Sequence, residues 1–229
     1  MEAVFSNFDD YLKAFGLTIG LFVVSGVASL VWGTVLAVLR VGPVSVLNKA
    51  AAVYVTLFRN TPLLMIFIFM AIAMPKLGYN FKFVEDVEIG GYNISAFFVR
   101  ATIALTLYTS AFVCEAMRSG VNAVPIGQAE AGRAIGLTFS QSMRLIVLPQ
   151  ASRAIIPPMT SVQIALLKNT SIAAAFGIAE ATATMRGLTN GNADQRIGIF
   201  LAFAIGYVVV VEVISFSSLL VERKVRVAR

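Results

Sequence analysis

Long hydrophobic segments alternate with short polar ones along the whole chain. Each segment is long enough to cross the roughly 30 Å hydrocarbon core of a bilayer as a helix, which takes about 20 residues. The five segments cover residues 17–39, 50–74, 94–117, 146–176 and 197–221. This pattern predicts an all-α integral membrane protein with about five transmembrane helices, forming one transmembrane domain over residues 1–229.

Two of these segments carry polar or helix-breaking residues inside an apolar run. The sequence Arg59-Asn60-Thr61-Pro62 interrupts the second segment, and the apolar stretch after it is too short to span a bilayer alone. We therefore expect one span that includes residues 51–58 and tolerates the break. The fourth segment is interrupted by Pro149, Pro157, Pro158 and Lys168. Because irregular backbone at membrane depth is tolerated only inside protein or beside water, we expect such a break to lie in the bundle interior.

Basic residues in the polar segments predict the orientation. Five spans place the two ends of the chain on opposite sides of the membrane. Ten basic residues fall on one side, namely Arg40, Lys49, Arg118, Arg133, Arg144, Arg153, Arg223, Lys224, Arg226 and Arg229. Six fall on the other, namely Lys13, Lys76, Lys82, Arg100, Arg186 and Arg196. Cytoplasmic loops are enriched in Lys and Arg, so we expect the N-terminus outside and the C-terminus in the cytoplasm, together with residues 118–153. Residues 1–16 do not resemble a signal peptide.

Composition narrows the function classes. Apolar residues make up 58% of the chain and charged residues 13%, against about 25% charged residues in ordinary soluble domains. There is no histidine and only one cysteine, which excludes histidine-based catalysis and cysteine or histidine metal clusters. None of the six lysines is followed by Ser or Thr, so the chain has no Walker A motif and cannot hydrolyse ATP by that route. We expect no catalytic residue, no metal site and no nucleic-acid partner, because the net charge of +6 is explained by membrane loops.

The polar segment 124–149 reads VPIGQAEAGRAIGLTFSQSMRLIVLP. Pro125 suits the first turn of a helix and Gly136 suits the position just past its end. Between them lies a short helix rich in small residues, in which Glu130 and Arg133 can pair at i,i+3 spacing. A second short helix is expected over residues 138–147, ending before Pro149. From these residues alone, the segment is either a protein-docking surface or an ordinary solvated loop.

One pattern in this segment resembles a known family. Glu130-Ala131-Gly132, three residues, Gly136, nine residues and Ile146-Val147-Leu148-Pro149 resemble the EAA loop of ABC importer permeases, with Gly132 in place of the second Ala. The stretches 54–64, 114–121 and 165–171 are similar to elements of the polar amino-acid (histidine, glutamine and glutamate) permeases. The resemblance is greatest to permeases of actinobacterial glutamate uptake systems.

The resemblance implies a type I (MetI-like) permease fold that works by alternating access. It implies a multi-pass subunit of a bacterial cell membrane that carries a polar amino acid, with glutamate expected. The implied partners are a cytoplasmic ABC ATPase dimer, which supplies ATP and Mg²⁺ chemistry, an extracellular amino-acid-binding protein, and a second related permease. A heterodimer is expected over a homodimer, and no cofactor is expected on this chain itself.

Two sets of site residues follow. By the resemblance, the ATPase docks on the loop, through Ile126, Gly127, Glu130, Ala131, Gly132, Gly136 and Leu137. Charges at membrane depth usually face a water path or the bundle interior, and broken helices form many transporter sites. We therefore expect substrate contacts from Arg59, Thr61, Lys168, Asn169, Thr170 and Ser171. The alternatives are a structural ion pair for Arg59, and interhelix hydrogen bonding or permease–permease packing for Lys168.

Other candidate ionisable residues at membrane depth are Glu115, Glu180 and Glu212. Glu115 and Arg118 are expected to pair at i,i+3 spacing, Glu180 to lie near the outer side or a gate, and Glu212 to pair across helices. Two rival functions remain open. An ion-coupled secondary transporter would usually have more spans and an internal repeat, which the chain lacks, and a non-transporting membrane scaffold would not explain the polar breaks.

Overall fold

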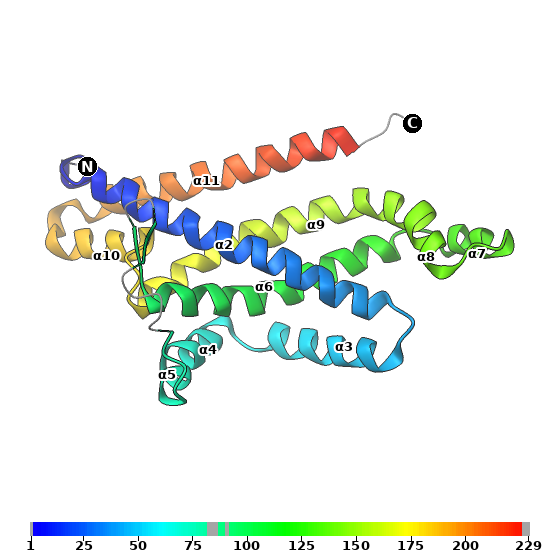
Figure 1. The fold of residues 1–229 in the computed structure, drawn as a ribbon. Coiled ribbons are helices and arrows are strands. Elements are labelled where there is room, and N and C mark those ends of the chain that lie inside the picture. The colour runs from blue at the N-terminus through cyan, green and yellow to red at the C-terminus, as the bar shows by residue number, and fades with distance from the viewer. Residues whose placement is uncertain (1, 82–86, 90–91, 226–229) are drawn as a thin grey trace.

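Long helices laid side by side form most of the computed structural model, which describes residues 2–81, 87–89 and 92–225 (Figure 1). The longest are α2 (Phe8–Val41), α3 (Ser45–Asn60), α6 (Ala96–Asn122), α9 (Leu148–Asn169) and α11 (Arg196–Val225). The shorter elements are α1 (Glu2–Ser6), α4 (Leu63–Ile68), the π-helix η1 (Phe69–Ala73), α5 (Met74–Lys76), α7 (Ile126–Ala134), α8 (Phe139–Ser142), the π-helix η3 (Met143–Val147), α10 (Ala181–Gly191), and the 3₁₀-helices η4 (Thr170–Phe176) and η5 (Ala193–Gln195).

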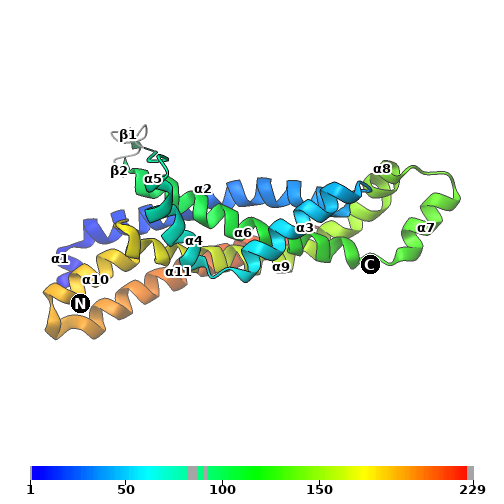
Figure 2. The same cartoon turned by 90° about the horizontal axis from the view of Figure 1, so that it is seen from below.

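Both views place α7 and α8 at one end of the elongated bundle and α1 and α10 at the other (Figures 1 and 2). Three helical segments, 8–41, 96–122 and 193–224, are long and apolar enough to cross a membrane. Two further pairs of helices qualify together, although each is bent. Counting each bent pair as one span gives the five spans that the hydrophobic pattern predicts.

The second span differs from the prediction, because it is not one continuous crossing. Between α3 and the helical segment 63–76 the chain turns by 99°. Thr61 is extended, with φ −94° and ψ 127°, because the ring of Pro62 disfavours helical geometry in the residue before it.

The start of the fourth span also differs from the prediction. The short helix expected over residues 138–147 does not stop before Pro149. The helical path runs from α8 through η3 into α9, and Pro149 takes the second position of α9. Proline has no N–H to donate to the preceding turn, and the helix changes from π to α type directly before it, at Leu148. A 3₁₀-helix follows α9, since η4 begins at Thr170 directly after Asn169 and ends before Gly177, which has φ +84°.

The first helix begins earlier than the hydrophobic pattern indicates. Residues 1–16 are polar enough to suggest a loop, yet α2 begins at Phe8. Tyr11 and Phe15 lie one helical turn apart and pack against Phe203 of α11, with ring centroids 4.9 and 5.9 Å away. Spacing of i and i+4 places both rings on the face toward α11, so tertiary contact stabilises this extension.

The core of the bundle follows the contact between α2 and α6. At Gly33 of α2 an added Cβ would lie 2.5 Å from Val113 Cγ1 and 2.8 Å from the Ser110 carbonyl oxygen of α6, so only glycine permits this approach. Leu21, Phe67, Leu105 and Leu166 join α2, α4, α6 and α9 in one buried cluster. Only 11% of the apolar window in segment 193–224 is buried, which leaves α11 available to lipid or to another subunit.

A two-stranded antiparallel sheet, β1 (Val87–Ile89) with β2 (Tyr92–Ile94), lies in the segment expected to be a polar loop.

Candidate functional site

The predicted docking loop forms a short helix with a defined end. Helix α7 begins directly after Pro125 and is followed by Gly136, which has φ +86°. The Leu137 N–H donates to the Gly132 carbonyl at 3.1 Å and the Gly136 N–H donates to the Arg133 carbonyl at 2.9 Å. These two bonds form a Schellman motif, which requires a left-handed residue where Gly136 stands. The next helix, α8, begins with a capping box between Thr138 and Gln141.

Most of the predicted docking residues are on the surface of this loop. Leu137 is half-buried, and the exposed residues of the set are Ile126, Gly127, Glu130, Ala131 and Gly136. Sequence reasoning missed two large apolar side chains beside them, Ile135 and Phe139, which are 78% and 50% exposed. The sequence feature that could have identified them is a pair of bulky apolar residues on either side of a helix end, within a polar segment. Exposed apolar side chains of this kind are typical of a protein-binding surface.

Gly132 was expected on the docking surface and is buried instead. An added Cβ there would lie 2.7 Å from Ile146 Cδ1 and 3.2 Å from Ser142 Oγ. Gly132 therefore packs α7 against the α8–η3 turn and presents nothing to a partner. The possible Glu130–Arg133 pair is not among the ion pairs of the described residues.

The structure places Arg59 in an ion-pair cluster around Glu115 of α6. Arg40 of α2 bonds one Glu115 carboxylate oxygen, and Arg118 and Arg59 lie 3.3 and 3.8 Å from the other. The Arg59 guanidinium also lies 5.6 Å from the centre of the Phe112 ring. This geometry supports the structural alternative for Arg59 and confirms the expected Glu115–Arg118 pair. One carboxylate thus joins α2, α3 and α6 beside the 99° bend.

Replacing Glu115 with alanine is expected to lower the free energy of unfolding by about 2 kcal/mol, because three guanidinium groups lose their common carboxylate in a partly buried place. Thermal unfolding in detergent should report a lower Tm. Glu130→Ala is the matched control, since Glu130 is exposed and has no ion pair among the described residues. Equal Tm values for the two variants would contradict a structural role for the cluster.

Lys168 and Ser171 line a cavity of about 480 Å³ between the end of α9, α10 and α11. Other polar groups on its wall are Thr182, Tyr207 and Glu212. The cavity therefore combines an amine, a carboxylate and three hydroxyls with apolar walls. Sequence reasoning missed Thr182 and Tyr207 as site residues. Tyr207 and Glu212 were nevertheless visible as polar residues within the mostly apolar stretch 197–214 of α11.

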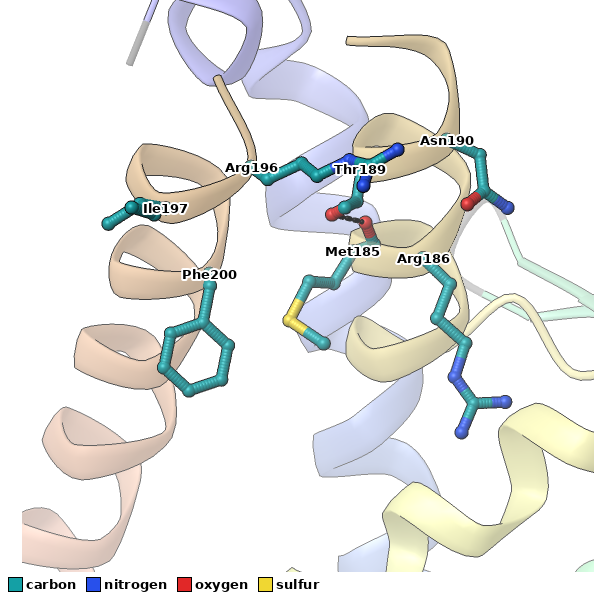
Figure 3. Close-up of a pocket in the computed structure, with 7 residues that line it drawn as sticks. All are labelled: Met185, Arg186, Thr189, Asn190, Arg196, Ile197 and Phe200. Carbon is teal, nitrogen blue, oxygen red and sulfur yellow. Dashed lines mark hydrogen bonds between the residues drawn. The ribbon is translucent and has the colours of Figure 1, made fainter. Parts of the chain in front are cut away.

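A second cavity, of about 390 Å³, lies between α10 and the start of α11 (Figure 3). Met185 and Phe200 line both cavities, which makes the two neighbours along the α10–α11 seam. In Figure 3 Met185 and Phe200 extend toward the space between the helices, whereas Asn190 extends away from it. Arg186 and Arg196 belong to this second wall, which carries no acidic residue.

The six predicted substrate contacts do not form one pocket. Asn169 faces a third cavity, of about 370 Å³, lined by Thr109, Ser161 and other residues of α6 and α9. Thr170 is fully buried, and its hydroxyl donates to the Leu167 carbonyl at 2.6 Å. Thr61 donates to the Leu57 carbonyl at 2.8 Å. Neighbouring helical residues point about 100° apart, so Lys168 and Asn169 lie on different sides of α9.

No metal site was found in the part of the chain that the structure describes, since it contains no group of three or more Asp, Glu or Cys side chains placed to hold an ion.

Curated proteins similar to this chain are amino-acid permeases. The chain is 39% identical to the glutamate transport system permease protein GluC of Corynebacterium efficiens over 204 residues, which is 86% of each protein. It is 35% identical to the glutamate/aspartate import permease protein GltJ of Escherichia coli over 219 residues, covering 93% of this chain and 86% of that protein. It is 36% identical to the probable glutamine ABC transporter permease protein GlnM of Bacillus subtilis over 172 residues, covering 75% and 73%.

Solved structures share the fold. An amino acid ABC transporter, crystallised with histidines, matches with a TM-score of 0.82 at 24% identity over 96% of each chain. The MetNI methionine ABC transporter, in an inward-facing conformation, matches with a TM-score of 0.69 at 20% identity over 96% of each chain. The family described as binding-protein-dependent transport system inner membrane component matches residues 29–227. With that match over most of its length, and the same helical arrangement in transporter structures, the chain belongs to the family of binding-protein-dependent transport system inner membrane components.

Proposed function

We propose that this chain is the permease subunit of an ATP-driven importer of a polar amino acid, with glutamate as its substrate. Relatives that are 39% and 35% identical over most of their length are named as glutamate and glutamate/aspartate permeases. The single observation in the structure that carries the proposal is the 480 Å³ cavity holding Lys168 and Glu212. A cation and an anion on one wall suit an amino-acid zwitterion, whose charged groups must be paired once they leave water.

Coupling to ATP hydrolysis is proposed to pass through the exposed face of α7. Without a Walker A motif, the chain needs a partner that hydrolyses ATP. The exposed Ile126, Ile135 and Phe139 give a cytoplasmic ATPase dimer an apolar surface to grip, and Gly136 sets the exit of the helix. The family description, which names binding-protein-dependent transport, supports an extracellular binding protein as the source of substrate.

The proposal includes the placement of the chain in a bacterial cell membrane. The N-terminus would lie outside, and α7, α8 and the end of α11 in the cytoplasm, as the distribution of Lys and Arg favours. The exposed apolar surface of α11 would meet a second, related permease, so that two half-channels enclose the α9–α11 cavities. An alternating-access cycle would then open these cavities to one side at a time.

Affinity purification of the tagged chain in mild detergent tests the proposal. We expect an ABC ATPase, a second permease and an amino-acid-binding protein to co-purify and be identified by mass spectrometry. An ATPase with this chain alone would contradict the heterodimer. Absence of any ATPase from a preparation that still carries folded chain would contradict the importer. In that case, dependence of uptake on an ion gradient would favour a secondary transporter.

A further inference from the structure

We propose that Glu180 is a positioning residue of the Lys168 cavity, which holds the Tyr207 and Thr182 hydroxyls with their oxygen lone pairs available to the substrate ammonium group. The inference rests on the proposed function, in which this cavity receives an amino acid. It assigns to Glu180, on the far side of the cavity wall, a role that the cavity lining alone does not reveal.

Glu180 is fully buried at the start of α10. One of its carboxylate oxygens accepts a hydrogen bond from the Ala183 N–H at 3.0 Å. The other accepts from the Tyr207 hydroxyl of α11 at 3.0 Å and lies 3.4 Å from Thr18 Oγ1 of α2. A single side chain therefore bonds α10 and α11 and contacts α2.

Capping of α10 alone does not explain why residue 180 has a glutamate side chain. Ser, Thr, Asp and Asn are the preferred N-cap residues, because their short side chains reach the first N–H groups. A buried carboxylate is costly unless it is paired, and Glu180 has no basic partner among the ion pairs of the described residues. The longer side chain is explained by its second bond, since it caps α10 and still reaches Tyr207.

The hydrogen bonds fix the direction in which protons point. Tyrosine has one hydroxyl proton, and Tyr207 gives it to Glu180. In the 3.1 Å contact between the Thr182 and Tyr207 hydroxyls, Thr182 must therefore be the donor. The Thr182 and Tyr207 hydroxyl protons therefore both point toward Glu180, along the chain of hydrogen bonds Thr182–Tyr207–Glu180. This leaves lone pairs on the two hydroxyl oxygens for a ligand. Lone pairs accept from an ammonium group, while Lys168 on the same cavity wall pairs with a carboxylate.

The contact with α2 supplies a matched control. The Thr18 hydroxyl accepts from the Ala181 N–H at 3.1 Å and lies 3.4 Å from the Glu180 carboxylate, so it ties α2 to the start of α10. Thr18→Val should loosen this junction and lower Tm, and it removes a contact to Glu180, but it keeps both groups of the Tyr207–Glu180 bond and both groups of the Thr182–Tyr207 bond. A variant that only lowers stability can thus be compared with one that changes the orientation of the Tyr207 and Thr182 hydroxyls.

The test uses the complete transporter in lipid nanodiscs, without the binding protein, and measures binding of radiolabelled L-glutamate. Competition with glutarate, which has both carboxylates but no ammonium group, measures how much that group contributes. Glu180→Gln keeps the shape and an oxygen for the Ala183 N–H, but its amide would donate to Tyr207 and reverse the proton chain. We expect a Tm near that of the wild type, a Kd for glutamate raised about tenfold, as for one lost hydrogen bond to a charged group, and an unchanged Kd for glutarate.

Tyr207→Phe should raise the glutamate Kd by a similar factor, and the double variant should be no worse than either single one, because both act through the same chain. Thr18→Val should change the glutamate Kd less than twofold. Wild-type binding and selectivity in Glu180→Gln, or additive effects in the double variant, would overturn the inference. If Lys168→Met loses glutamate binding while Glu180→Gln does not, only the positioning role fails. If Lys168→Met binds glutamate normally, the cavity is not the substrate site, and the positioning role of Glu180 fails with it, while the importer function is still decided by whether an ATPase co-purifies.

Discussion

Replacing Gly136 with valine is expected to abolish ATP-driven uptake while the chain still inserts and folds. Gly136 has φ +86°, a conformation that costs non-glycine residues about 1–2 kcal/mol, and more for a β-branched one. The Schellman bonds that end α7 depend on this conformation. An added Cβ would meet nothing within 4 Å, so the damage is confined to the path of the loop. The exposed Ile135 and the turn into α8 would move away from the ATPase.

Uptake of radiolabelled glutamate in proteoliposomes, together with ATP hydrolysis stimulated by the binding protein, measures this uncoupling. Gly78→Val is the matched control, because Gly78 has φ +93° with nothing within 4 Å of an added Cβ. It carries the same backbone strain in a different loop, so its uptake should be close to that of the wild type. Normal uptake by Gly136→Val would show that the end of α7 does not transmit the signal.

Replacing Lys168 with methionine is expected to lower glutamate uptake more than a hundredfold. Loss of a hydrogen bond to a charged group in a cavity costs roughly 3 kcal/mol when the other charge is left unpaired, and 1.4 kcal/mol is about tenfold. Methionine keeps much of the side-chain volume, so packing of the cavity wall is preserved. Glu212, on the same wall, would then be the only charge facing the substrate carboxylates and would repel them.

Uptake rates against substrate concentration, with the amount of intact complex measured in parallel, check this expectation. Lys168→Arg should retain part of the activity, since it retains the charge. Lys49→Met, at an exposed position on α3, controls for removal of a surface lysine. If Lys168→Met loses uptake only because the subunits separate, Lys168 serves permease packing, and the substrate role is wrong.

Most of the predicted docking residues lie together on one loop, whereas the six predicted substrate contacts do not form one pocket. This difference has a physical cause. The loop residues are close in sequence, so helix periodicity, a proline at one end and a glycine at the other suffice to predict α7 and its left-handed end. The predicted substrate contacts come from two distant segments, and a list of polar residues at membrane depth does not say which ones meet. For Arg59 the sequence allowed both a substrate contact and a structural ion pair, and the packing of α3 places it beside Glu115.

The residues that sequence reasoning missed are those whose place in the candidate site depends on contact with another helix. Tyr207 and Thr182 become site residues only because α10 lies against α11. The burial of Gly132 likewise depends on α7 folding back onto Ile146. An extended family pattern identified the loop but could not say which of its small residues face inward.

By itself, the sequence determined the helical class, the absence of a Walker A motif and the position of α7 with its left-handed end, and it predicted five spans, which the structure gives when each bent pair counts as one. These properties depend on hydrophobicity and on local backbone preferences, which act within about 20 residues. Pro62 accounts for a break at Thr61, but the tertiary structure alone decided that the chain turns there by 99°. It also decided the ion-pair cluster at Glu115 and the separation of Lys168 from Asn169 into different cavities. Those depend on how helices distant in sequence pack, because a charged or polar group at membrane depth is stabilised only by the partners that packing brings to it.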